Sequence, residues 1–447
     1  MTTAMHSSNA APKPSPRGSH RMLPLVAGLA AFCVYSCMYA FRKPFSAASY
    51  DAMSWLGVDY KIWLVIAQVM GYAISKLWAI RLVPELHPAN RGKAILVLIG
   101  LSWLALLGFA LAPPLPGIVF LFLNGLPLGM VWGLVFGYIE GRQATELMGA
   151  ILASSFIFAS GVVKGVGKAM LLAGVSEHWM PFLTGLVFVP PLLLSLRTLE
   201  RLPPPTAEDI AARAPRGRMD REARRQFLRR FLPGLLLIVP LYVLLTVLRD
   251  FRENFDTEIF RDLGFGRSAL VFGEVDTPIG VGVLMLTASL SLVRDNMRAF
   301  MLNHVLIAAG LCCAGLSTLL FAHHELPPLT WMTLVGFGLY LGYIPLNGMF
   351  FERLMATFRV AGTVSFVMYL ADASGYLGSV AVLLVRQFLA LQLNWTQFFE
   401  RAVLTSSLLG LVLVALSARW FWWHGRQNGL TTTSSPLSPL KMESSRL

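Results

Sequence analysis

Charged residues are scarce in this chain. Asp, Glu, Lys and Arg make up 14% of its 447 residues, whereas a soluble domain carries about 25%. Hydrophobic residues make up 55%. This balance excludes an ordinary soluble protein and is typical of a chain that crosses a bilayer many times.

The sequence also lacks the usual signatures of enzymes and metal proteins. Its four cysteines all lie inside apolar runs, so they provide neither a disulfide framework nor a zinc-binding spacing. We find no GxxxxGK[ST] loop for a nucleotide and no nucleophile elbow. We therefore expect no enzyme, no metal site and no cofactor.

Acidic residues are fewer than basic ones, with 24 against 37 and a net charge of +13. Ten arginines lie between Arg197 and Arg230, so much of the excess sits in one loop, and nucleic acid is not an expected partner. Loops rich in Lys and Arg stay in the cytoplasm. We expect this loop and both termini to be cytoplasmic, in a multi-pass protein of a bacterial inner membrane that acts as a monomer.

Long apolar runs are abundant. Taking about 20 residues per crossing, we predict an all-α polytopic membrane protein with twelve transmembrane helices in two six-helix halves. The predicted segments are 23–45, 61–83, 94–112, 117–139, 148–172, 180–199, 232–255, 268–293, 299–322, 329–351, 361–387 and 401–423. The predicted organisation is a disordered N-terminus (1–22), a first bundle (23–199), an Arg-rich linker (200–231), a second bundle (232–423) and a disordered tail (424–447).

Tyrosines recur at helical spacing before basic residues. Tyr35 and Tyr39 precede Arg42 by seven and three residues, Tyr72 precedes Lys76 by four, and Tyr242 precedes Arg249 by seven. Such spacings put each set on one helical face. The guanidinium fork suits carboxylate and phosphate groups, and tyrosine hydroxyls can donate to the same oxygens. With Lys164, these residues predict a cationic cavity for a small anionic solute. The alternative is that the two arginines lie at the membrane surface, because long basic side chains can snorkel.

Carboxylates inside apolar segments are energetically unfavourable unless they are paired or functional, because a charge at the bilayer centre costs roughly 2.5–3.5 kcal/mol. We expect Asp250, Glu274, Asp276 and Asp372 to pair with basic groups or to carry protons. A ladder of glycines four residues apart predicts close packing between helices; it consists of Gly125, Gly129, Gly133, Gly137 and Gly141.

Five motifs occur in order along the predicted segments. They are Tyr35-x-x-x-Tyr39-x-x-Arg42-Lys43, Tyr72-x-x-Ser75-Lys76, Tyr242 to Arg249, Glu274 with Pro278 and Gly280, and Ala361-Gly362-Thr363 with Gly375-Tyr376-Leu377-Gly378. In these motifs the chain resembles the organophosphate:phosphate antiporter branch of the major facilitator superfamily. The resemblance implies that Arg42 and Arg249 clamp a phosphate, assisted by Lys76 and the tyrosines. Asp250 beside Arg249 departs from that pattern, since a carboxylate can neutralise the arginine and alter specificity.

These observations predict a secondary transporter that exchanges a phosphate-bearing solute by alternating access. Two alternatives remain open at this point. One is proton-coupled transport of a solute without phosphate, which would use the buried carboxylates. The other is a membrane sensor that keeps the fold and transports nothing.

Overall fold

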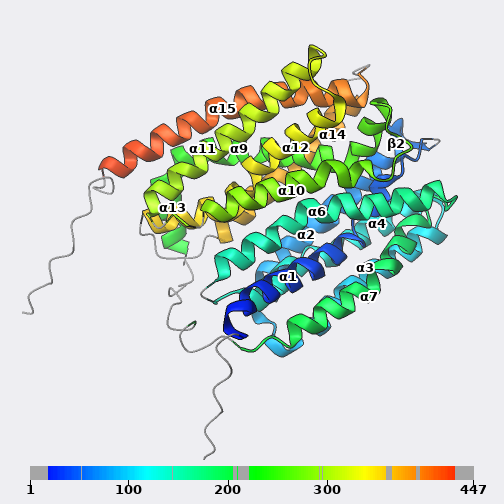
Figure 1. The fold of residues 1–447 in the computed structure, drawn as a ribbon, viewed down its shortest axis with the longest axis horizontal. Helices are drawn as coiled ribbons and strands as arrows, with labels where there is room; N and C mark the ends of the chain where they lie inside the picture. The colour runs from blue at the N-terminus through cyan, green and yellow to red at the C-terminus, as the bar shows by residue number, and fades with distance from the viewer. Residues whose placement is uncertain are drawn as a thin grey trace, which may run out of the picture.

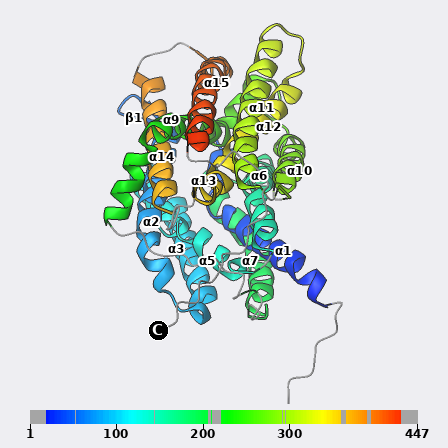
Figure 2. The ribbon, with the colours of Figure 1, turned by 90° about the vertical axis from the view of Figure 1, so that its left-hand side faces the viewer.

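In a computed structural model, the chain is almost entirely helical, and its helices form two groups that lie side by side (Figures 1 and 2). The structure describes residues 19–51, 53–142, 144–204, 209, 221–290, 292–293, 295–358, 365–388 and 393–427. The expected disordered ends lie mostly outside these ranges.

The first half contains α1 (Ser19–Tyr39), α2 (Tyr60–Glu85), α3 (Arg91–Leu111), α4 (Pro114–Leu128), α5 (Val131–Ile139), α6 (Thr145–Leu172) and α7 (Met180–Glu200). Two short 3-10 helices, η1 (Pro44–Ala47) and η2 (Pro88–Asn90), and a hairpin of β1 (Ser54–Trp55) and β2 (Val58–Asp59) lie in its loops. The second half contains α9 (Arg221–Asp262), α10 (Val271–Leu290), α11 (Asn296–Ala322), α12 (Pro328–Pro345), the π-helical turn η3 (Leu346–Phe350), α13 (Phe351–Thr357), α14 (Ser365–Phe388) and α15 (Trp395–Gln427).

Ten helical segments of the described chain are long and apolar enough to cross a membrane. The expected segments 329–351 and 361–387 coincide with α12 and α14, which are not among the ten. The fold is therefore an all-α, multi-pass membrane architecture, and the count of twelve spans is not confirmed.

The two halves meet through two pairs of helices. The second helix of the first half, α2, packs along α14, and α6 packs along α10. The start of α1 and the end of α15 lie at the same end of the molecule, on the left of Figure 1. We call this the terminal end, and we call the opposite end, where the β1–β2 hairpin lies, the far end.

The first helix ends earlier than expected. We placed Arg42 on the same helix as Tyr39, but α1 ends at Tyr39 and a turn follows, in which the Arg42 amide donates to the Tyr39 carbonyl at 3.0 Å. Pro44 accounts for the ending, because its nitrogen has no hydrogen and cannot donate to the Ala40 carbonyl, so the helical hydrogen bonds stop at the bond from Lys43 to Tyr39. Arg42 therefore lies on a turn.

The seventh predicted segment is longer than expected. Helix α9 has 42 residues, or about 63 Å at 1.5 Å per residue, against about 30 Å for the hydrocarbon core of a bilayer. Its first turns, from Arg221, use residues that we assigned to the linker. Its last turns, to Asp262, continue at the far end and carry the charged residues that face the first half.

The glycine ladder lies on two helices, with a break between them. A Cβ at Gly125 would lie against the backbone carbonyl of Gln68, and one at Gly129 would lie 2.7 Å from the carbonyl oxygen of Tyr72, so α4 and α2 approach backbone to backbone. Gly141 lies beyond α5 with a φ of +76°, a conformation that favours glycine.

Candidate functional site

Arg42 lies between the two halves on the turn that follows α1. Its side chain is buried, with 6% of the residue exposed. The guanidinium stacks on the ring of Tyr72 at 3.9 Å and lies 5.8 Å from the ring of Tyr39. Within the described part of the chain, no carboxylate lies within 4.0 Å of it. In the described chain, the groups that contact its charge are the rings of these two tyrosines.

Buried amides fix the turn that carries Arg42. Gln68 on α2 donates to the Arg42 carbonyl at 2.7 Å, and Asn124 on α4 donates to the Phe41 carbonyl at 2.8 Å. The two amides are bonded to each other at 2.8 Å. These bonds satisfy carbonyls that the end of the helix leaves free. The turn is therefore held by the same α2–α4 contact that the glycines allow.

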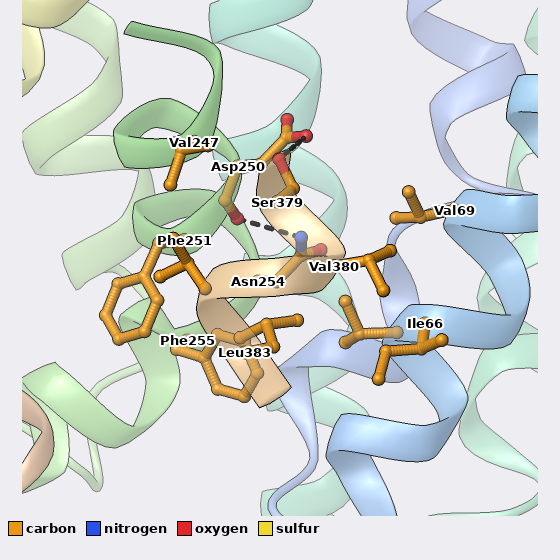
Figure 3. A pocket seen from close by; sticks show the side chains of 12 residues that line it. Ile66, Val69, Val247, Asp250, Phe251, Asn254, Phe255, Ser379, Val380 and Leu383 are labelled. Atoms are coloured by element: carbon orange, nitrogen blue, oxygen red, sulfur yellow. Dashed lines mark hydrogen bonds between the residues drawn. The ribbon is translucent and has the colours of Figure 1, made fainter. Parts of the chain in front are cut away.

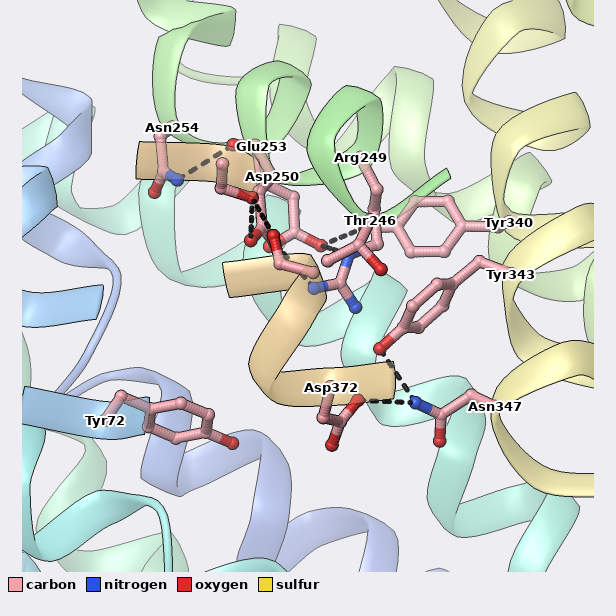
Figure 4. A network of polar contacts seen from close by, with 12 residues as sticks. Tyr72, Thr246, Arg249, Asp250, Glu253, Asn254, Tyr340, Tyr343, Asn347 and Asp372 are labelled. Atoms are coloured by element: carbon pink, nitrogen blue, oxygen red, sulfur yellow. Dashed lines mark hydrogen bonds and ion pairs between the residues drawn. The ribbon is translucent and has the colours of Figure 1, made fainter. Parts of the chain in front are cut away.

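Arg249 lies on α9 in a different electrostatic setting. It stacks on Tyr343 at 4.1 Å, as Arg42 stacks on Tyr72. However, its guanidinium also bonds to Asp250 at 2.6 Å and lies 3.8 Å from Glu253. Figure 4 shows Arg249 between these carboxylates and Tyr343. Arg249 is therefore neutralised by carboxylates of its own helix. In the phosphate clamp that the resemblance implies, Arg249 would instead be free to bind the phosphate together with Arg42.

A second polar group surrounds Asp372 on α14. Lys76 of the first half bonds to Asp372 at 2.6 Å, and Tyr242 donates to the same carboxylate. Asn347 joins them by bonding to the hydroxyls of Tyr242 at 2.6 Å and Tyr343 at 2.9 Å. The Lys76 and Asp372 side chains are 20% and 14% exposed. In the described chain, this is the most accessible ion pair between the halves apart from the exposed Arg261–Asp51 pair.

Further ion pairs join the halves toward the far end. Lys43 bonds to Glu253 at 3.0 Å, and Lys61 bonds to Glu258 at 2.6 Å. Lys164 on α6 pairs with Asp256 on α9. In each of these pairs the first half supplies the lysine and the second half supplies the carboxylate. All six side chains are 3% exposed or less.

The remaining predicted residues have separate positions. Asp276 on α10 pairs with Arg252 at 2.9 Å. Glu274 is exposed and lines a groove of about 270 Å³ with Thr330 and Leu334, and in the described chain it has no ion pair. Lys164 is fully buried, whereas Lys168 is only partly buried.

The tyrosine pair of the first half is also at the site. The hydroxyls of Tyr35 and Tyr72 lie 3.4 Å apart, and the rings of Tyr35 and Tyr39 pack edge to face at 5.7 Å. Both tyrosines of α1 are buried. Together they form the wall of the site on the side of Arg42.

A small pocket lies between α2, α9 and α14 (Figure 3). Its volume is about 10 Å³ and its lining is mostly apolar, with Asp250, Asn254 and Ser379 as polar members. A cavity of this size has room for about one water molecule. It cannot hold a solute in this conformation.

Sequence reasoning missed several members of the site. Asp256, Glu258 and Lys61 had no role in the prediction, and Tyr343 and Asn347 were not singled out. The sequence pattern that could have identified part of the site is the spacing of Tyr340, Tyr343 and Asn347. These polar residues are three and four positions apart, which places them on one helical face. No cluster of three possible metal ligands occurs among the residues that the structure describes.

Comparisons with solved structures identify the fold. The structure is similar to a D-xylose-proton symporter, with a TM-score of 0.57, 13% identity, and coverage of 89% of this chain and 97% of the other. It is also similar to the nucleoside transporter NupG, with a TM-score of 0.58, 14% identity, and coverage of 89% of this chain and 99% of the other. A third similar structure is a bacterial homologue of the human lysosomal transporter Spinster in an inward-facing and unoccupied conformation. Its TM-score is 0.54, its identity is 12%, and the match covers 93% of this chain and 99% of the other. At these identities the likeness establishes the fold alone.

No curated protein sequence matches the chain. A family model does match, over residues 44–424, and its description is a family of unknown function, DUF5690. The match begins two residues after Arg42, so it covers the elements from η1 to most of α15 and leaves out α1 and Arg42. The chain therefore belongs to the DUF5690 family, and it has the fold of the major facilitator superfamily.

Proposed function

We propose that this protein is a secondary transporter that carries a small anionic solute across the membrane by alternating access. The observation that carries the proposal is the state of Arg42, which is buried between the halves and has no carboxylate within 4.0 Å in the described chain. Burying an unpaired charge is costly. A bound anion would offset that cost.

The position of Arg42 also suits a transported solute. Ligands of this fold bind near the midplane between the halves, and the halves rock around the bound ligand. Hydrogen-bond donors and acceptors from both halves lie on the other side of Tyr72, and they belong to Lys76, Asp372, Tyr242 and Asn347. Such groups suit the polar remainder of a small organic anion. The resemblance to organophosphate antiporters favours a phosphate-bearing solute and exchange against phosphate.

Exchange of labelled phosphate in proteoliposomes tests this function. Vesicles with purified protein are loaded with unlabelled phosphate, and entry of labelled phosphate is followed with sugar phosphates as competitors. We expect entry that requires internal phosphate. In the Arg42→Ala variant, loss of charge-assisted hydrogen bonds worth about 1.5–3 kcal/mol each should reduce it at least about tenfold.

Arg261→Gln is the matched control, because Arg261 is an exposed arginine that pairs with Asp51 at the far end. It should retain entry. If the Arg42→Ala variant is folded and exchanges phosphate at the full rate, the proposal for Arg42 is wrong.

A second candidate is proton-coupled transport, which the inter-half ion pairs favour. Asp256 and Glu258 pair with lysines of the other half, so opening of the far end would separate them from those lysines. A buried carboxylate without its partner binds a proton more readily. Uptake driven by a pH gradient, with no requirement for internal phosphate, would support this candidate over exchange.

A further inference from the structure

The charged side chains that are buried in the described chain, together with the half-buried Lys76–Asp372 pair, can be matched one to one, with one basic residue left over. The six carboxylates in this set and their partners are Asp250 with Arg249, Glu253 with Lys43, Asp256 with Lys164, Glu258 with Lys61, Asp276 with Arg252, and Asp372 with Lys76. Arg42 is the seventh basic residue of the set and has no such partner in the described chain. With every group ionised, the set has a net charge of +1.

From this pairing we infer that the transported solute is a singly charged oxyanion, and that Asp250 sets this limit by neutralising Arg249. The inference rests on the proposed function and narrows its substrate class. Two free arginines would balance a dianion. One free arginine balances a monoanion, and a dianion would leave an extra negative charge in a site that is largely shielded from water.

The geometry supports Asp250 as the residue that sets the charge. Its Oδ1 bonds to Arg249 at 2.6 Å, and its Oδ2 accepts a bond from Ser379 at 3.0 Å, so both oxygens are occupied. Asp250 is 4% exposed. The carboxylate is thus held against the arginine by a neighbouring helix, and it cannot easily move away when a solute arrives.

The inference distinguishes forms of the same phosphate ester. A phosphate monoester has a second pKa of about 6, so it changes from a monoanion to a dianion between pH 6 and pH 8. A sulfate ester has nearly the same shape and keeps a single charge throughout. A site for monoanions should therefore accept the sulfate ester at every pH and accept the phosphate ester progressively less as the pH rises.

The experiment measures how an alkyl phosphate and the matching alkyl sulfate inhibit anion exchange by the full-length protein in proteoliposomes, between pH 6 and pH 8. The readout is the ratio of the two inhibition constants, which cancels any titration of the protein itself. We expect the phosphate to weaken relative to the sulfate by about fiftyfold, which is the fall in its monoanion fraction for a pKa of about 6. In the Asp250→Asn variant, whose site has one more positive charge, the fall should shrink to about fivefold or less.

Asp51→Asn is the matched control, because it removes the same charge from an exposed pair at the far end. It should keep the wild-type ratio. A wild-type ratio that stays constant with pH, or a sulfate ester that does not inhibit, would overturn the inference even if Asp250→Asn failed to fold. Absence of any anion exchange would instead refute the proposed function, so the two failures are distinguishable.

Discussion

Arg42 and Arg249 stack on tyrosines in the same way, Tyr72 at 3.9 Å and Tyr343 at 4.1 Å, but only Arg249 has a carboxylate beside it. The repeated Tyr and Arg spacing thus gives two arginines in similar aromatic surroundings, one with an unpaired charge and one with a charge that a carboxylate neutralises. Lys76 resembles Arg249 in this respect, because Asp372 neutralises it. At the scale of single residues, the site is defined by which basic groups are already paired.

This pairing makes a prediction for Lys76. In Lys76→Gln, Asp372 keeps its charge without a partner, and the site loses its net positive charge, so anion uptake should fall at least about tenfold. The double variant Lys76→Gln with Asp372→Asn restores the net charge and should recover much of the uptake. Initial uptake rates in proteoliposomes measure both. A double variant as inactive as Lys76→Gln would contradict this account, because it would mean that the Lys76 ammonium itself is required whatever the net charge of the site.

Helices α2 and α4 approach so closely that backbone groups touch, and this contact positions the site. Gln68 on α2 holds the turn of Arg42 through its side chain, and its own carbonyl lies against Gly125. Any side chain at position 125 would push α2 away. The turn that carries Arg42 therefore depends on a glycine that packs against α2 and does not contact the arginine.

We predict that Gly125→Ala destabilises the protein and reduces uptake, because the added Cβ meets the Gln68 carbonyl. Overpacking of this kind costs typically 1–3 kcal/mol. Gly100→Ala on α3 is the control, since nothing lies within 4 Å of a Cβ there. It should be neutral or stabilise the helix by up to about 1 kcal/mol. Thermal unfolding in detergent measures both, and equal melting temperatures for the two variants would contradict this account.

Most of the helices could be predicted from the sequence, because apolar runs of bilayer length are a direct physical signal. The end of α1 was missed, although Pro44 was visible, because the apolar run continues past Tyr39. Most of the partners of the site were missed because an ion pair such as Lys61 with Glu258 joins residues 197 positions apart. Periodicity within one helix carries no information about such pairs.

At the scale of the whole molecule, the ion pairs that join the halves lie mainly toward the far end. Lys61–Glu258 and Lys164–Asp256 are buried there, and Arg261–Asp51 is exposed. In the described chain, Lys76–Asp372 is the inter-half pair nearest the terminal end. The conformation is therefore one in which the halves are held together at the far end.

Breaking one buried pair should loosen this contact. Lys61→Gln or Glu258→Gln leaves its partner buried and unpaired, which costs about 3–5 kcal/mol. Exchanging the two residues, as Lys61→Glu with Glu258→Lys, should recover part of that stability. The exposed pair is the control: Asp51→Asn should cost about 1 kcal/mol or less. Thermal unfolding of the four variants tests this, and equal losses at Lys61 and Asp51 would count against a buried contact.

The polarity of the inter-half pairs has a consequence for how the protein is made. The first half is synthesised before the second, and its contact face presents Arg42, Lys43, Lys61, Lys76 and Lys164 with no acidic partner from the other half. A lone charge within the bilayer costs roughly 2.5–3.5 kcal/mol. Water, lipid headgroups or a chaperone must therefore shield the basic face of the first half until the acidic residues of α9 have been synthesised. The length of the segment between α7 and α9 contributes to that delay.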